Sequence, residues 1–186
     1  MSHPKEPKPV KLICSLFSAE EDLIHWVIGE LEEFLGPVDW KSPPLFFDKS
    51  RFYEPEMGWP LYRRFVSFRD LIGPGQLVDI KLKTNEIEAR YSLKGRRRIN
   101  IDPGYVAPER FILATGKNYT HRIYLDRGIY ADLTLIYRKG SYRPLEWTYP
   151  DYASLEFIRL FNEIRMNYMK QLREGGRLAK EHDRLW

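Results

Sequence analysis

The chain has 186 residues, of which 43% are hydrophobic and 30% charged, and its formal net charge is +4. These proportions suit one globular domain and exclude a disordered chain and a collagen-like repeat. No apolar run approaches the roughly 18 residues of a membrane-spanning helix, and the first residues lack the apolar core of a secretory signal. We therefore expect a cytoplasmic protein without a membrane partner.

Cys14 is the only cysteine, which excludes an internal disulfide and cysteine-rich zinc motifs. It lies in the apolar run Val10–Phe17, so we expect a packed thiol, with a nucleophile as the alternative. The four histidines form no HxH or HExxH pattern, so we expect no dedicated zinc site and assign no metal ligand, and whether a divalent metal binds at Asp102 is open. The sequence leaves any cofactor unknown.

Residues 1–9 contain three prolines, and we expect a flexible arm before a single domain over residues 10–172. The run Val10–Phe17 predicts a buried strand. Ser18 and Glu21 have the spacing of a helix capping box. The apolar residues that follow recur at helical spacing and predict a helix that ends at Gly36–Pro37.

The stretch from Val38 to Pro60 is rich in proline and aromatic residues. It is too long and too aromatic for a flexible linker, and long ordered connections often carry function. We expect its part Phe47–Gly58 to cover a binding site, with Tyr53 as a ligand contact.

Two interpretations are open for the next segments. After a strand at Tyr62–Phe68, the alternation in Leu77–Lys83 predicts another strand, followed by a short helix that Thr84 caps. The alternative is one helix over Gln76–Tyr91.

A short strand is predicted at Ile99–Asp102, ending in a turn at Asp102–Tyr105. Proline in that turn fixes φ and glycine admits positive φ. The apolar segment Pro108–Thr115 is compatible with a helical turn or a strand.

The strongest pairing signal is a hairpin over His121–Tyr137, whose two runs flank the loop Asp126–Gly128. Pairing Leu125 with Ile129 sets the register of the whole hairpin, because a slip of one residue would mix apolar and charged residues on both faces. The expected opposed pairs are Ile123 with Ala131, His121 with Leu133, Arg122 with Asp132, and Tyr124 with Tyr130.

A second turn at Arg138–Ser141 leads to a strand through Trp147. Asp151 is expected to cap a helix that runs to about Leu172 and ends before Gly175–Gly176, leaving a charged tail over 173–186. The rings of Trp147–Tyr152 suit packing under the start of this helix, with anion binding by the helix amides as the alternative.

These elements predict an α+β fold, in which a mixed, mostly antiparallel sheet carries the N- and C-terminal helices on one face. The residues expected under the helices are Ile99, Ile101, Ile123, Leu125, Ala131, Leu133 and Leu135.

The opposite, open face of the predicted sheet is the candidate site. It is expected to carry Asn100, Asp102, Arg122, Tyr124, Tyr130 and Asp132. Carboxylates, an arginine, an amide and phenols on one surface suit proton transfer or the binding of an anionic ligand. The alternative is structural, because Arg122 opposite Asp132 is also an ordinary cross-strand ion pair.

Asp102, Asp132 and His121 are the catalytic candidates, since His121 would be the best general base if it lies beside Asp102. A structural role for His121 is the alternative. The candidates for ligand binding are Asn100, Arg122, Tyr124, Tyr130, Tyr53 and Lys81.

Several motifs of nucleotide and acyl chemistry are missing, namely GxxxxGK[ST], GxGxxG and GxSxG. The basic cluster Lys94–Arg98 could bind nucleic acid, but few aromatic residues accompany it, and a solvated turn explains it as well.

Seven stretches together resemble a prokaryotic family known as domain-of-unknown-function family 4416, some of whose members are labelled GTP-binding protein. They are PVKLICSLFS at Pro9–Ser18, RRFVSF at Arg63–Phe68, DIKLKTNEIE at Asp79–Glu88, RRINIDPGYV at Arg97–Val106, HRIYL at His121–Leu125, and LIYRKG with WTYPDY near the C-terminus. The resemblance covers nearly all of residues 9–170. It implies one recurring domain and assigns no catalytic residue.

From the residues we expect a protein that binds a small anionic or nucleotide-like ligand on the polar sheet face. Whether it is also an enzyme is open. The alternatives are a non-catalytic homodimeric interaction protein, in which the exposed tyrosines join two copies, and an RNA-binding accessory protein.

Overall fold

A sheet of nine strands lies at the centre of the computed structural model, which describes residues 1–47, 51 and 53–182 and, over 176–182, the backbone alone. The strands are β1 (Val10–Ser18), β2 (Val38–Lys41), β3 (Leu45–Phe47), β4 (Leu61–Ile72), β5 (Ile99–Val106), β6 (Arg110–Thr115), β7 (Arg122–Asp126), β8 (Ile129–Arg138) and β9 (Ser141–Pro144). The helices are α1 (Glu21–Leu35), α2 (Glu54–Met57), a 3-10 turn η1 (Pro74–Gln76), α3 (Leu77–Tyr91) and α4 (Leu155–His182).

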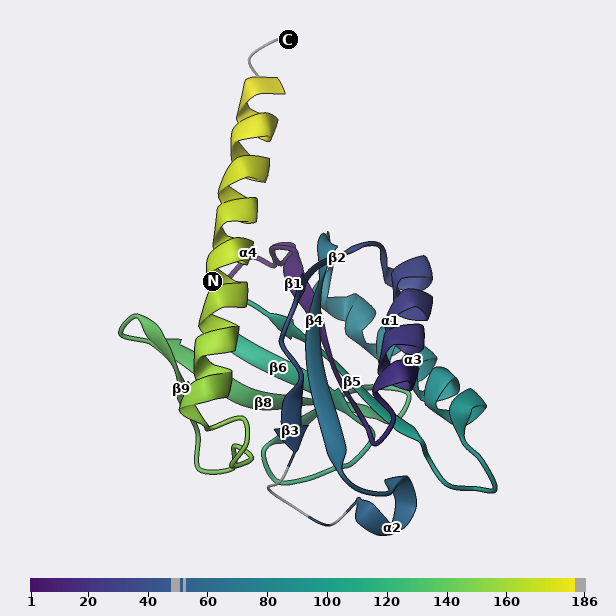
Figure 1. Cartoon of the computed structure of the whole chain (residues 1–186). Coiled ribbons are helices and arrows are strands. Elements are labelled where there is room, and N and C mark those ends of the chain that lie inside the picture. Colours follow the sequence, from purple (N-terminus) through teal and green to yellow (C-terminus); the bar gives the residue numbers. More distant parts are fainter. Residues whose placement is uncertain (48–50, 52, 183–186) are drawn as a thin grey trace.

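The strand order is β2-β4-β1-β5-β6-β8-β7, with β3 beside β4 and β9 beside β8 (Figure 1). Each pairing between these strands is antiparallel. The predicted α+β class is confirmed.

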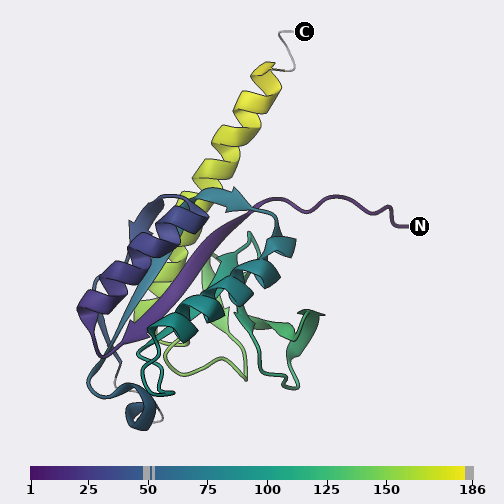
Figure 2. The ribbon, with the colours of Figure 1, turned by 90° about the vertical axis from the view of Figure 1, so that its right-hand side faces the viewer.

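Helices cover both faces of the sheet, so the prediction that α1 and α4 share one face is wrong. Every residue of the central strand β1 is buried. Its Leu12, Cys14 and Leu16 belong to the core cluster of α1 and α3, whereas Ile13 belongs to the cluster of α4 on the opposite face. Figure 2 shows α1 and α3 together on one side of the sheet and α4 behind it. A strand that is apolar on both sides needs cover on both sides.

The helix predicted after the first strand is confirmed as α1, in which the apolar positions Leu23, Ile24, Val27, Ile28 and Leu31 are buried. The predicted capping box is wrong. Ser18 is the last residue of β1, and its hydroxyl donates to the carbonyl of Arg98 at 2.6 Å and accepts from the Glu20 amide at 3.0 Å. The helix begins three residues later, and the side chain of its N-cap residue, Glu20, makes no capping hydrogen bond.

The aromatic stretch after α1 contains β2, β3 and α2. Phe17, Phe47 and Tyr53 form one aromatic cluster, with ring centroids 4.9–6.2 Å apart. Positions 48–50 and 52 of the predicted cover over Phe47–Gly58, and positions 183–186 of the predicted tail, lie outside the described residues.

The segment predicted as a strand at Leu77–Lys83 is the first half of one helix, α3, as in the alternative. Its buried residues are Leu77, Val78, Ile80, Lys81, Thr84, Ile87 and Glu88, a helical spacing that the local alternation obscured. Thr84 lies inside the helix and donates to the carbonyl of Lys81 at 3.0 Å.

The predicted turn at Asp102–Tyr105 does not form, because β5 continues through Pro103 and Gly104 alongside β1. The β5–β6 pairing runs only from Gly104 to Val106. Pro103 lies before this pairing, so its missing amide costs no sheet hydrogen bond. The segment Pro108–Thr115, which the sequence left compatible with a helical turn or a strand, contains strand β6.

The hairpin register is confirmed for its three central pairs, in which residues 122, 123 and 124 face 132, 131 and 130. At the loop, Asp126 instead of Leu125 pairs with Ile129, because the register shifts by one residue there. Ile123 is 69% exposed and Leu125 39%, so the prediction that helices cover them is wrong. β7 is the last strand of the order, at one edge of the sheet.

A bulge in β8 changes the face of Leu135. Phe111 pairs with Leu135 and the next residue, Ile112, with Leu133, so Thr134 is the extra residue. Leu133 therefore packs against the α3 cluster, whereas Leu135 belongs to the α4 cluster. The two residues were expected on the same face.

Helix α4 is longer than predicted at its C-terminal end, and its inward residues Phe157, Phe161, Ile164 and Tyr168 are buried as expected. Ser154, not Asp151, accepts the first-turn amide of Phe157, at 3.2 Å. The helix continues through the glycines at 175 and 176, each of which disfavours a helix by only about 1 kcal/mol. Among the described helices, none combines the length and apolar character of a membrane span.

Candidate functional site

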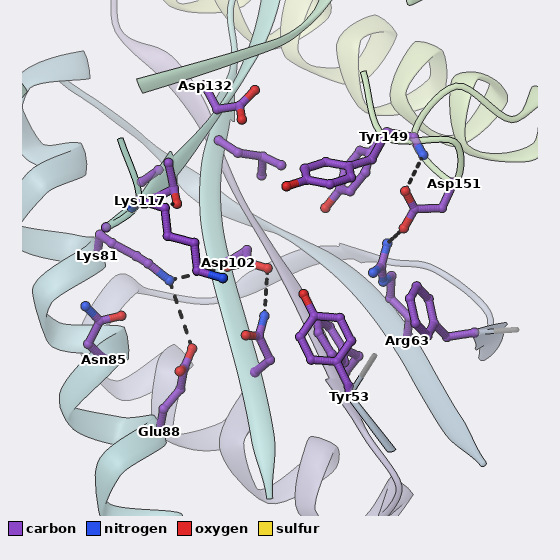
Figure 3. A pocket seen from close by; sticks show the side chains of 18 of the residues that line it. Tyr53, Arg63, Lys81, Asn85, Glu88, Asp102, Lys117, Asp132, Tyr149 and Asp151 are labelled. Atoms are coloured by element: carbon purple, nitrogen blue, oxygen red, sulfur yellow. Dashed lines mark hydrogen bonds and ion pairs between the residues drawn. The ribbon is translucent and has the colours of Figure 1, made fainter. Parts of the chain in front are cut away.

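A cavity of about 650 Å³ opens on the α4 side of the sheet, where β5 and β6 separate. Its walls come from strands β1, β3, β4, β5, β7 and β8, the end of β6, helix α3 and connecting segments, among them the one before α4. Five basic and four acidic side chains line it, together with several aromatic rings. Figure 3 shows Lys81 and Glu88 on one side and Arg63 and Asp151 on the other, with Asp102 and Lys117 between them. Cavities of this size commonly hold small molecules.

Before Gly104, β5 has no paired strand on its β6 side, and two side chains of α3 hydrogen-bond to its backbone there. Glu88 Oε1 accepts the amide of Ile101 at 2.6 Å, and Lys81 Nζ donates to the Ile101 carbonyl at 2.9 Å. Lys81 Nζ also lies 3.3 Å from Asp102 Oδ1 and 4.0 Å from Glu88 Oε1. The buried edge of β5 is thus hydrogen-bonded by charged side chains, which hold the cavity open at this point.

Asp102 is more accessible than Glu88, with a side chain that is 34% exposed against 10%. Asn100 Nδ2 donates to its Oδ2 at 2.6 Å. The oxygen of Asn100 in turn accepts Arg97 Nη1 at 2.9 Å, and the remaining donors of Arg97 bind Glu56 in a bidentate pair at 2.7 and 2.8 Å. The hydrogen bonds from Arg97 lower the pKa of Glu56. The carboxylate of Asp102 is therefore held in place by donors on both sides.

A second ion pair closes the cavity at β7 and β8. Arg122 Nε donates to Asp132 Oδ2 at 2.8 Å, and Arg122 Nη2 donates to the hydroxyl of Tyr149 at 3.2 Å. His121 Nε2 lies 3.3 Å from the same oxygen of Asp132, and its ring stacks on Trp147 with centroids 5.0 Å apart. His121 supports Asp132 from behind and does not line the cavity.

A third ion pair joins Arg63 of β4 to Asp151, with Nη1 2.6 Å from Oδ2. Both side chains are buried, at 5% and 11% exposure. Phe17, Phe47 and Tyr152 lie around the guanidinium, with ring centroids 4.9–5.4 Å from its carbon. This end of the cavity is consequently aromatic, whereas the end at Lys81 and Asp102 is polar.

The fold brings six of the predicted site residues to the cavity, and they are Asn100, Asp102, Arg122, Asp132, Tyr53 and Lys81. Tyr124 and Tyr130 pack against each other on the hairpin, with centroids 5.4 Å apart, and like His121 they are not part of the lining. The exposure of Tyr124, Ile123 and Leu125 agrees with the alternative of an interaction surface, which stays a prediction.

The sequence interpretation missed Glu88, Arg97, Arg63, Lys117 and Asp151. Lys81, Asn85 and Glu88 follow one another at spacings of four and three residues along α3, so the helical alternative would have placed all three on one face. Arg63 and Asp151 are 88 residues apart, and nothing in the local sequence relates them.

The basic cluster at Lys94–Arg98 forms a tight turn in which Lys94 and Gly95 have positive φ. Its Arg97 binds Glu56, and Arg98 binds Glu20 at 2.5 and 2.8 Å. Cys14 is buried, which raises the pKa of its thiol and supports the packed state. Within the described residues, no group of three or more His, Cys, Asp or Glu side chains could hold a metal ion.

Burial raises the pKa of Glu88 above its ordinary 4.5, against the opposing effects of Lys81, the Ile101 amide and Arg97, and with a further raising effect from Asp102. The folded chain therefore binds this proton more tightly than the unfolded chain. Between the two pKa values, rising pH should lower the free energy of unfolding.

We expect Glu88→Gln to remove this dependence. Relative to the variant, the native protein should lose stability as the pH rises from about 4.5 towards neutrality, in urea unfolding series. The matched control is Glu86→Gln, an exposed carboxylate on the same helix. A constant difference between native protein and Glu88→Gln across this range would contradict the assignment.

A family described as "Domain of unknown function (DUF4416)" matches residues 8–168. No curated protein and no solved structure matches the chain.

Proposed function

Since the chain belongs to the family described as a domain of unknown function (DUF4416), a name that assigns no activity, we propose from the geometry of its cavity that it binds a small organic anion with a flat ring. The observation that carries the proposal is the lining itself, in which a surplus of basic groups adjoins an aromatic wall.

The charges of the lining favour a ligand with a single anionic group. Arg63, Arg97 and Arg122 each bind a carboxylate, and Lys81 binds Asp102 and the carbonyl of Ile101. Lys117 has no hydrogen bond or ion pair at its ammonium within the described residues, and it lies near Asp102 in the cavity (Figure 3). Because most of the basic charge is already compensated, the cavity suits a monoanion or phosphate monoester better than a polyphosphate.

The aromatic side chains favour a flat ring. Phe17, Phe47 and Tyr53 line one wall of the cavity. Tyr149 and Tyr152, from the segment before α4, line it as well. Burial raises the pKa of Tyr53, so its hydroxyl is protonated near neutral pH. Rings of this kind bind planar groups by stacking or edge contacts.

The test is isothermal titration calorimetry with two flat-ring anions of different size, 4-hydroxybenzoate and adenosine monophosphate. We expect at least one of them to bind, and Gly116→Trp to weaken that binding at least tenfold. Gly116 lines the cavity, and a Cβ added there meets no atom within 4 Å, so a side chain can be attached at this position and we expect the indole to occupy the cavity.

The matched control is Gly75→Trp. This glycine is equally open and lies outside the cavity, in η1. Binding that is equally strong in Gly116→Trp and Gly75→Trp would place the ligand elsewhere. The absence of binding by both probes to the native protein would contradict the proposal.

A further inference from the structure

Arg63 is a buried side chain at the aromatic end of the cavity that retains hydrogen-bond donors unused by the described residues. The side chain is 5% exposed, and Nη1 makes its only hydrogen bond within the described residues, to Asp151. Its Nε is buried and has no hydrogen-bond partner in the part of the chain that the structure describes. Buried donors in folded proteins are nearly always bonded, so the free side of this guanidinium points to an acceptor that is bound from solution.

Among the described residues, the surroundings of Arg63 supply no such acceptor. Five aromatic rings lie within 5.8 Å of the guanidinium carbon, and they belong to Phe17, Phe47, Phe65, Tyr152 and Phe157. Asp151 uses one of its oxygens for Arg63 and the other for the amide of Tyr152 at 2.9 Å. The carboxylate is thus oriented by the backbone and leaves the other edge of the guanidinium free.

A planar guanidinium edge with two parallel donors matches a carboxylate or phosphate, and low local polarity strengthens such a contact. Lys117 is the competing cation, but it is exposed and its ammonium is a hydrated point charge without a fixed orientation. The acid group of a ligand is therefore recognised more specifically at Arg63 than at Lys117.

We infer that the ligand of this cavity is a hydroxylated aromatic acid whose oxyanion binds the free edge of Arg63. Its ring then lies along Phe17, Phe47 and Tyr53, which adjoin Arg63, and its hydroxyl reaches the acceptor Asp102 at the polar end. This inference rests on the proposed function and specifies the ligand class and its orientation.

The experiment compares 4-hydroxybenzoate with the neutral amide 4-hydroxybenzamide by isothermal titration. We expect the acid to bind the native protein at least tenfold more tightly than the amide. Arg63→Lys keeps a cation for Asp151 but loses the forked donors, so the ratio of the two affinities should fall towards one. Because the ratio is taken within one variant, a general loss of folded protein affects both probes alike.

Lys117→Ala is the matched variant and should keep the native ratio. A ratio that falls in Lys117→Ala and persists in Arg63→Lys would overturn the inference and leave the binding function intact. Binding of adenosine monophosphate without binding of 4-hydroxybenzoate would also overturn the inference and leave the binding function intact. If none of the three probes binds, the proposed function fails together with the inference.

Discussion

Replacing Gly104 with alanine is expected to destabilise the folded chain by about 3 kcal/mol. A Cβ at this position would lie 2.3 Å from the carbonyl oxygen of Ile112 and 2.9 Å from Leu113 Cδ2. The first of these atoms is backbone in the paired strand β6 and has no room to move without breaking the β5–β6 pairing. The need for glycine here comes from the close approach of two strands.

Gly29→Ala is the control, because this helical glycine has no atom within 4 Å of an added Cβ. It should stabilise the chain by about 1 kcal/mol, since alanine favours a helix. Urea unfolding of the three proteins measures both effects. Equal stabilities of native protein and Gly104→Ala would mean that β5 does not run straight through this position.

Asp151→Ala should cost about 3–5 kcal/mol, because it leaves the guanidinium of Arg63 buried without a counter-charge. The pair is nearly inaccessible, and its 2.6 Å contact links β4 to the segment before α4. Asp79→Ala is the control. It removes the partner of Arg127 from a pair whose side chains are more than half exposed, and such pairs contribute at most about 1 kcal/mol.

Unfolding by urea compares Asp151→Ala with Asp79→Ala under the same conditions. A loss in Asp151→Ala no larger than that of the control would show that Arg63 finds another partner or remains hydrated. In that case water would reach the guanidinium of Arg63 at the aromatic end of the cavity, in spite of the apolar residues that line it.

The hairpin β7–β8 was the most predictable part of the fold. Its register followed from the alternation alone, because only one pairing keeps Arg122 opposite Asp132 and the apolar residues together. Helix α1 and the buried strand β1 were equally clear, because long periodic runs carry strong signals.

Other parts were decided by contacts that local sequence does not record. The alternation in Leu77–Lys83 reads as a strand until the burial of Lys81 and Glu88 against β5 is known. The pair Pro103–Gly104 reads as a turn until β1 and β6 are placed on either side. The face of the sheet that α4 covers is decided by its packing against Phe65 and Phe111, which come from strands distant in the sequence.

The candidate site was predictable in its polar half. Asn100, Asp102, Arg122 and Asp132 were placed together by the expected sheet, although the sheet separates between β5 and β6 where a continuous surface was expected. The aromatic half, with Arg63 and Asp151, depends on a contact between residues 88 positions apart. No periodic pattern in the sequence reveals it.

The cavity as a binding site is tested most directly by native mass spectrometry of gently purified protein, with denaturing mass spectrometry of the same sample. We expect a fraction of the native protein to carry the additional mass of a small organic acid, released on denaturation and absent from Gly116→Trp. The same additional mass in both proteins, or its presence only in Gly116→Trp, would contradict a ligand bound in this cavity.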